Sequence, residues 1–282
     1  MTYTSVSPIT INGLTLNTTD TNGTQWRVRK FDGWAGATNP TGEMVRRTRR
    51  SGFWAGDSFS EGRHMALTIM VISASAAQHS LDLDTLNAAF PRTFSRMDVS
   101  ESGRVRYAYV RRSGEILPQK INRWTSIVSV MVSSKDWRKF GDDLVGLTFL
   151  PASSGGLTVP FTVPFTIDAV SVSGQIALTN PGNEVGPVRM RIDGPCTGPV
   201  VTHVGSASAL IFSSSLVLLA DEWLDIDMEA HTVLANGQAS RAGYITSRGW
   251  SGFDPGVNVW SFTAAAFDPA SQLTVTATPA DE

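Results

Sequence analysis

The sequence has a single cysteine, Cys196, and only four histidines. One cysteine excludes an internal disulfide bond and any metal site built from several cysteines. No apolar run reaches 18 residues, so no membrane-spanning helix is expected. The first residues also lack the basic and apolar regions of a secretory signal, so we expect the chain to be made in the cytoplasm without export.

Motifs for catalysis and cofactor binding are missing as well. No GxSxG, Walker or GxGxxG pattern occurs, and the histidines show no HExxH or other metal-ligand spacing. Cys196 lies among proline and glycine residues that predict a turn, and no histidine stands near it in a recognisable catalytic signature. We therefore predict no catalytic residue, no cofactor and no metal.

The residues that are plentiful favour turn-rich β structure. The chain has 282 residues, 41% of them hydrophobic, with 25 glycines, which is long enough for two domains. Between Asp168 and Thr278, short segments alternate polar and apolar residues, and turn signals such as Asn236–Gly237 separate them. This pattern predicts a mainly β protein with a carboxy-terminal β-sandwich at residues 168–282.

The amino-terminal half combines strands with one helix. A helix is expected over about residues 76–90, where a serine caps it and Pro91 ends it. The expected strands around it are residues 9–16, 25–29, 65–72, 104–111, 116–123, 125–133 and 144–150. We predict a β-sandwich or bent sheet with one α-helix over residues 1–152, followed by a linker at residues 153–167.

The two halves carry opposite net charge. Residues 1–150 hold 19 Lys and Arg against 13 Asp and Glu, whereas residues 151–282 hold 4 against 12. This asymmetry suggests different partners for the halves, although two domains with different surfaces would show it equally. The positive charge is too dilute to indicate specific nucleic-acid binding.

The most distinctive segment is a glycine-rich stretch at about residues 35–62. Its candidate interface residues are a basic cluster and the aromatics around it: Arg46, Arg47, Arg49, Arg50, Phe53, Trp54 and Phe59. Long loops are usually functional, and arginine and aromatic residues are enriched at interfaces. Nucleic acid or plain solvent could also face this segment. We favour an arm that packs on a neighbouring subunit, because it explains the length, the glycines and the aromatics together.

Three carboxylates alternate with apolar residues in the carboxy-terminal half. Asp225, Asp227 and Glu229 are expected on one face of one strand, with His231 just beyond it. Glycoside hydrolysis needs two carboxyl groups that face each other, and calcium sites draw mostly on loops. We interpret the row as a solvated sheet face.

Tryptophans suggest a second function, binding of a host-surface glycan. Trp250, Trp260 and Trp223 are candidates for stacking on a sugar, although the apolar neighbours of Trp260 indicate a core position. Trp250, Asp225 and Asp227 are the candidate ligand-facing residues. A carbohydrate-binding β-sandwich is therefore the alternative to an assembly protein.

The order of these features resembles the distal tail proteins of long-tailed bacteriophages. The likeness is closest in the carboxy-terminal half, in residues 174–183, 187–194, 224–226 with Asn236–Gly237, and 249–251 with 254–258, followed by the strand 259–262. In the amino-terminal half it rests on the order of strand, glycine-rich arm, strand, helix and further strands.

The resemblance implies a structural virion protein at the tail tip. Proteins of this family close a hexameric ring through their amino-terminal domains, each clasped by a belt from its neighbour, and they carry a galectin-like carboxy-terminal module. The belt would correspond to residues 35–62 here. The implied partners are the tail tube protein and the tail hub or tail-associated lysin protein, with the tape-measure and receptor-binding proteins as further contacts.

Overall fold

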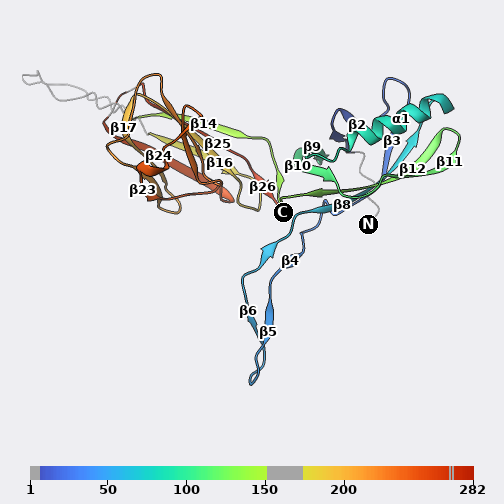
Figure 1. Ribbon diagram of the computed structural model, residues 1–282, viewed down its shortest axis with the longest axis horizontal. Helices are drawn as coiled ribbons and strands as arrows, with labels where there is room; N and C mark the ends of the chain where they lie inside the picture. The colour runs from blue at the N-terminus through green and yellow to red at the C-terminus, as the bar shows by residue number, and fades with distance from the viewer. Residues whose placement is uncertain (1–6, 151–173, 267, 269) are drawn as a thin grey trace, which may run out of the picture. The chain divides into compact units, whose positions relative to one another are not determined.

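A computed structural model describes residues 7–150, 174–266, 268 and 270–282. The chain divides into two compact units, one of residues 1–141 with Glu282 and one of residues 142–281. Both are built from strands, and α1 (Ala76–Ala89) is the single α-helix of the described residues (Figure 1). The predicted mainly β fold with one helix is confirmed. The linker expected at residues 153–167 lies outside the described residues.

The first unit is organised around one antiparallel sheet. Its strands run in the order β2-β1-β9-β10-β12-β8-β3, with β11 paired to β12 and β13 paired to β10. The bounds are β1 (Ile9–Ile11), β2 (Leu14–Leu16), β3 (Gln25–Asp32), β8 (His64–Ile72), β9 (Ser95–Glu101), β10 (Arg104–Arg112), β11 (Leu117–Asn122), β12 (Thr125–Ser134) and β13 (Lys139–Phe140).

This sheet curls around its own core. The two ends of the order, β2 and β3, are joined by a hairpin in which the backbone of Trp26 bonds to Asn17 and Thr18. Alternate residues of β8 and β12 point inward, and together with Trp26 and the helix residue Leu86 they form the buried cluster. The sequence predicts either a β-sandwich or a bent sheet with one helix for this unit, and the structure has the bent sheet.

Local signals place α1 where the sequence predicts it. Ser75 has extended backbone and accepts a hydrogen bond from Gln78 N at its side chain, which satisfies one free N–H of the first turn. Phe90 forms the carboxyl cap, and Pro91 follows it. The residues at which the helix begins and ends can therefore be recognised in the sequence without knowledge of tertiary contacts.

Helix α1 meets the sheet through a buried polar network. Asp82 Oδ2 accepts hydrogen bonds from Thr24 Oγ1 at 2.7 Å and from Ser73 Oγ at 2.5 Å. His79 contacts Ser73 Oγ through Nδ1 at 2.9 Å and Ser126 Oγ through Nε2 at 2.8 Å. Because the Ser73 hydroxyl donates to Asp82, His79 Nδ1–H donates to Ser73. Burial lowers the pKa of the ring and so favours the neutral imidazole, in which Nε2 accepts from Ser126.

We expect acid to weaken the first unit through His79. Burial lowers the pKa of His79, although the Asp82 carboxylate acts in the opposite direction. A histidine with a lowered pKa takes up a proton on unfolding, so acid favours the unfolded state. The contribution of His79 to the free energy of unfolding is therefore fully present above the pKa of an unfolded histidine, about 6.5, and declines as the pH falls below that value. Urea unfolding between pH 8 and pH 5 should show a steeper decline than in His79→Gln, by at most about 1.4 kcal/mol per pH unit, which is the limit for one proton. Equal pH dependence in the two proteins would contradict this assignment.

The second unit is a sandwich of two sheets. One runs in the order β14-β25-β16-β20-β21-β22, and the other in the order β15-β24-β17-β18-β23 with β19 paired to β17. The bounds are β14 (Leu144–Phe149), β15 (Gln175–Asn180), β16 (Val188–Asp193), β17 (Cys196–His203), β18 (Ser208–Phe212), β19 (Val217–Leu218), β20 (Trp223–Asp227), β21 (Thr232–Ala235), β22 (Ala239–Ser240), β23 (Ile245–Arg248), β24 (Gly256–Ala266), β25 (Gln272–Ala277) and β26 (Ala280–Asp281). The short 3₁₀ turn η1 (Ala242–Tyr244) precedes β23.

One strand belongs to a different unit from the one expected. The sequence analysis assigns the strand at residues 144–150 to the amino-terminal domain, but β14 pairs with β25, from Leu144 opposite Ala277 to Phe149 opposite Gln272. Its partner lies more than 120 residues away, so no local pattern shows the pairing. The second unit accordingly begins at Asp142.

In the part of the chain that the structure describes, no helix is long and apolar enough to cross a membrane.

Candidate subunit interface and outer sheet face

The glycine-rich segment forms a two-stranded hairpin that leaves the first unit between β3 and β8 (Figure 1). Its strands are β4 (Pro40–Thr41), β5 (Met44–Arg46), β6 (Phe53–Ala55) and β7 (Phe59–Ser60), with β4 paired to β7 and β5 to β6. We call residues 35–62 the arm. Every residue in these four strands is exposed.

The arm exposes large apolar side chains as well as arginines. Trp54 is 66% exposed and Phe59 is 68% exposed, and Phe53 lies beside Trp54 on β6. The Arg47 guanidinium lies 4.6 Å from the centre of the Trp54 ring. Large exposed aromatics next to arginines are the composition of protein-binding surfaces. The tip also holds Arg46, Arg49 and Arg50, the remaining candidate interface residues.

The base of the arm is held by a buried arginine that sequence reasoning missed. Arg63 is 1% exposed, and its Nη1 donates hydrogen bonds to the carbonyl oxygens of Gly33 at 2.9 Å, Trp34 at 3.2 Å and Gly36 at 2.6 Å. Its Nε and Nη2 donate to the Trp137 carbonyl at 3.1 and 2.9 Å. One side chain thus ties the start of the arm to the turn before β13.

Further polar contacts reinforce this base. Lys139 is buried and donates from Nζ to the Trp34 carbonyl at 3.2 Å. Glu282 Oε1 accepts hydrogen bonds from Thr38 N at 3.1 Å and from Thr38 Oγ1 at 3.0 Å. Burial lowers the pKa of Arg63, whereas the Glu282 carboxylate raises it. The cations are therefore stabilised by carbonyl dipoles and a carboxylate that together compensate their loss of hydration.

Glycine is required at both ends of the arm. At Gly33, whose φ is +82°, a Cβ would lie 2.1 Å from the His64 carbonyl oxygen. At Gly62 a Cβ would lie 2.4 Å from the Ser134 carbonyl oxygen. Both are clashes with backbone, so side chains cannot be accommodated there by rotation. The only sequence signal for Arg63 was its place between Gly62 and an apolar strand.

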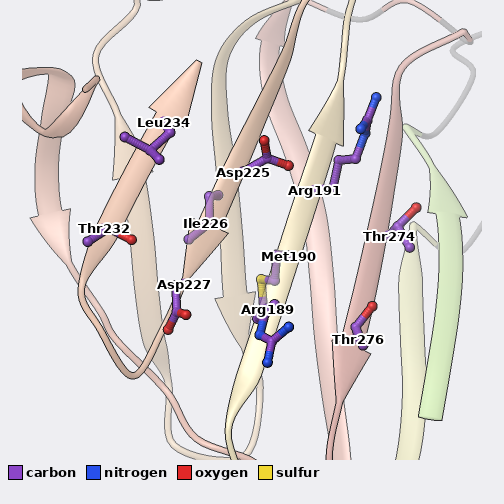
Figure 2. Close-up of a pocket in the computed structure, with 10 residues that line it drawn as sticks. All are labelled: Arg189, Met190, Arg191, Asp225, Ile226, Asp227, Thr232, Leu234, Thr274 and Thr276. Atoms are coloured by element: carbon purple, nitrogen blue, oxygen red, sulfur yellow. The ribbon is translucent and has the colours of Figure 1, made fainter. Parts of the chain in front are cut away.

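The second candidate region is the outer face of the β16–β20–β25 sheet (Figure 2). Asp225 and Asp227 face outward on β20, while Leu224 before them and Ile226 between them are buried. Glu229 lies beyond the end of the strand, and its N–H donates to Asp227 Oδ1 at 3.0 Å. The strand thus carries two of the three expected carboxylates.

These two carboxylates face arginines of the neighbouring strand. The register places Arg191 opposite Asp225 and Arg189 opposite Asp227. A shallow depression of about 440 Å³ lies over these residues, bordered by Thr274 and Thr276 of β25 and by Thr232 and Leu234 of β21 (Figure 2). Opposite charges across strands stabilise a sheet. Among the described residues no group of three His, Cys, Asp or Glu could hold a metal ion.

The tryptophans near this region are engaged in packing. Trp260 is fully buried, as its neighbours predict. Trp250 is partly buried and packs against the core. The His231 ring stacks on the Trp250 ring with their centres 4.8 Å apart, so the contact of His231 is with Trp250 and not with the carboxylates. Trp223 donates from Nε1 to Asp225 Oδ2 at 2.9 Å, and Arg191 lies 4.4 Å above its ring. The rings of Trp250 and Trp223 are thus each contacted by a neighbouring side chain, His231 at Trp250 and Arg191 at Trp223.

Cys196 is buried in the core of the second unit. Burial raises the pKa of its thiol to about 11, although a hydrogen bond with Ser271 acts the other way. A thiol of that pKa stays protonated near neutral pH and is a poor nucleophile.

No family model matches the sequence, and no curated protein matches it. Similarity is found among solved structures. The SPP1 Dit protein (gp 19.1), described as a paradigm of the hub adsorption apparatus in phages that infect Gram-positive bacteria, superposes with a TM-score of 0.67 at 13% identity, over 97% of this chain and 99% of that one. The chain has the fold of a phage Dit protein.

Two further structures carry the same fold. Chains of the phage p2 baseplate in its activated conformation match with TM-scores of 0.51, at 10% identity in the form with calcium and 11% in the form with strontium. They cover 97% and 96% of this chain, and 98% of their own chains in each case. The Dit fold therefore includes both units, and the likeness predicted from the sequence is confirmed at the level of fold.

Proposed function

We propose that this chain is a structural protein of a phage tail tip that assembles as a hexameric ring. The ring connects the tail tube to the tail hub and the receptor-binding apparatus. The observation that carries the proposal is the arm, a hairpin of exposed aromatic and arginine side chains held rigidly at its base in a protein with the Dit fold.

The geometry of such an arm supports a ring. An arm that binds a surface elsewhere on the next copy makes a head-to-tail contact, and head-to-tail contacts close into rings when the rotation per subunit allows it. The exposed Phe53, Trp54 and Phe59 supply the apolar centre of that contact, and the arginines supply its polar rim. Six equivalent contacts would bury all six arms.

The rest of the proposal concerns partners and location. The ring is made in the host cytoplasm and becomes part of the virion at the tail tip, between the tail tube protein and the tail hub or tail-associated lysin protein. The tape-measure and receptor-binding proteins are further contacts. The second unit, a galectin-like sandwich, serves as an outer contact module, and no catalytic step is assigned to either unit.

The mass of the purified protein in solution tests this proposal. We expect light scattering after size exclusion to give six times the mass of one chain, and electron micrographs to show a six-fold ring. A protein that stays monomeric at high concentration would refute the ring, and a closed assembly of another number would refute the hexamer.

A further inference from the structure

A depression lined by cationic side chains lies on the first unit, at the end of the sheet where the arm returns. It has a volume of about 650 Å³, and its lining includes Arg92, Arg111, Arg112, Lys135, His64 and Ser133. No carboxylate lines it within the described part of the chain. We call this depression the basic pocket.

The strand register builds the basic pocket. Arg111 of β10 stands opposite Ser133 of β12, and Ser133 stands opposite His64 of β8, so the three share one row across the sheet. The 2.9 Å contact between His64 Nδ1 and Ser133 Oγ shows that their side chains lie on the same face. Arg92 adds a second arginine from the loop after α1, and Lys135 comes from the turn after β12.

The positive charge in the basic pocket has little local compensation. Asp136, which follows Lys135 directly, is paired with Arg138, whose Nε and Nη2 lie 3.0 and 2.8 Å from its carboxylate oxygens. Like charges brought together repel, and a concave surface lined by one sign concentrates the field. A bound anion would relieve this repulsion, which makes the pocket a candidate anion site.

We propose that the basic pocket binds the carboxylates of an acidic segment on a neighbouring protein. Guanidinium groups take carboxylates through paired hydrogen bonds. That the neighbour is a tail protein rests on the proposed ring function, whereas the preference for carboxylates rests on the pocket itself.

Nucleic acid fits the basic pocket less well. Single strands are held by an extended basic groove with open aromatic faces on which bases stack. The aromatic ring in this pocket is Phe94, and Arg111 already lies 5.1 Å above it. The cations also surround a single depression, whereas a backbone-tracking site is an extended groove.

Peptide binding measured by fluorescence anisotropy tests the inference. The probe is a fluorescein-labelled peptide of alternating Asp and Glu, compared with an oligothymidine of equal charge and the same label. We expect the full-length protein to bind the peptide more tightly than the oligothymidine, and the affinity to fall between about 50 mM and about 300 mM salt. Arg111→Glu with Arg112→Glu should weaken peptide binding at least about tenfold.

A matched control carries the same charge change elsewhere on the sheet. Arg27→Glu with Arg29→Glu alters two exposed arginines of β3 and should change peptide binding by less than about threefold. If the Arg111 and Arg112 variant does not fold, Arg92→Glu with Lys135→Glu removes the charge from the flanking loops instead. An equal loss in the control, no peptide binding by the unaltered protein, or tighter binding of the oligothymidine would overturn the proposal.

The mass of the same samples separates this inference from the ring. A protein that binds the peptide as a monomer would refute the ring and leave the anion site standing. A six-fold ring that does not bind the peptide would refute the anion site and leave the ring proposal standing.

Discussion

Shortening the arm is expected to convert the proposed ring into monomers that remain folded. Thr41 and Phe59 are paired across the hairpin, so an Asn–Gly turn can replace residues 42–58 without disturbing the base. The removed residues are exposed, apart from the half-buried Arg47, and make no part of the buried core, so the free energy of unfolding should change by less than about 1 kcal/mol. Light scattering should then give the mass of one chain, and urea unfolding should give the stability.

Two milder variants separate the aromatic from the basic part of the arm. Phe53→Ser with Trp54→Ser keeps the length and the charges, and it should weaken each subunit contact by about 2 kcal/mol or more. Arg49→Ala with Arg50→Ala keeps the aromatics and should have a smaller effect that disappears at high salt. A shortened protein that still sediments as a ring would show that the arm does not close it.

Replacing Arg63 should give the largest loss of stability in the first unit. Arg63→Met leaves the carbonyl groups of Gly33, Gly36 and Trp137 without the donor that they share. These bonds are part-buried, and a hydrogen bond to a charged group contributes about 1.5–3 kcal/mol, so we expect the free energy of unfolding to fall by about 3 kcal/mol. The urea midpoint of the first unit measures this change.

Controls for Arg63 use the same chemistry in another place. Arg29→Met removes an exposed arginine of β3 and should change the stability by less than about 0.5 kcal/mol. Arg63→Lys keeps the charge but cannot reach both sides of the arm base, so it should lie between the two. A loss below about 1 kcal/mol in Arg63→Met would mean that the arm base is held by other contacts.

The elements that the sequence predicted well are those defined by neighbouring residues. Helix α1 was expected at about 76–90 and spans Ala76–Ala89, because Ser75 and Pro91 act locally. The strand expected at residues 65–72 is β8, His64–Ile72. It could be predicted because an apolar run of that length indicates a buried strand. The alternation in β20 likewise placed Asp225 and Asp227 on the outer face before any partner strand was known.

The parts that were missed depend on residues far apart in the chain. The membership of β14 in the second unit comes from its pairing with β25. The role of Arg63 could not be predicted from its place after Gly62, because its acceptors are backbone carbonyls of residues 33, 34, 36 and 137, and a backbone carbonyl is present whatever the residue type. The cations of the basic pocket are spread from Arg92 to Lys135, and along the sequence they amount to a dilute positive charge.

The sequence by itself determined the β-rich class, the position of the helix, and an exposed arm of arginines and aromatics, since each follows from composition and short-range periodicity. Only the tertiary structure decided which contacts hold that arm, to which unit β14 belongs, and where cationic residues that are far apart in the sequence lie close together. The physical reason is that hydrogen-bond acceptors, strand partners and electrostatic fields are properties of positions in space, and the register of the sheet brings those positions together.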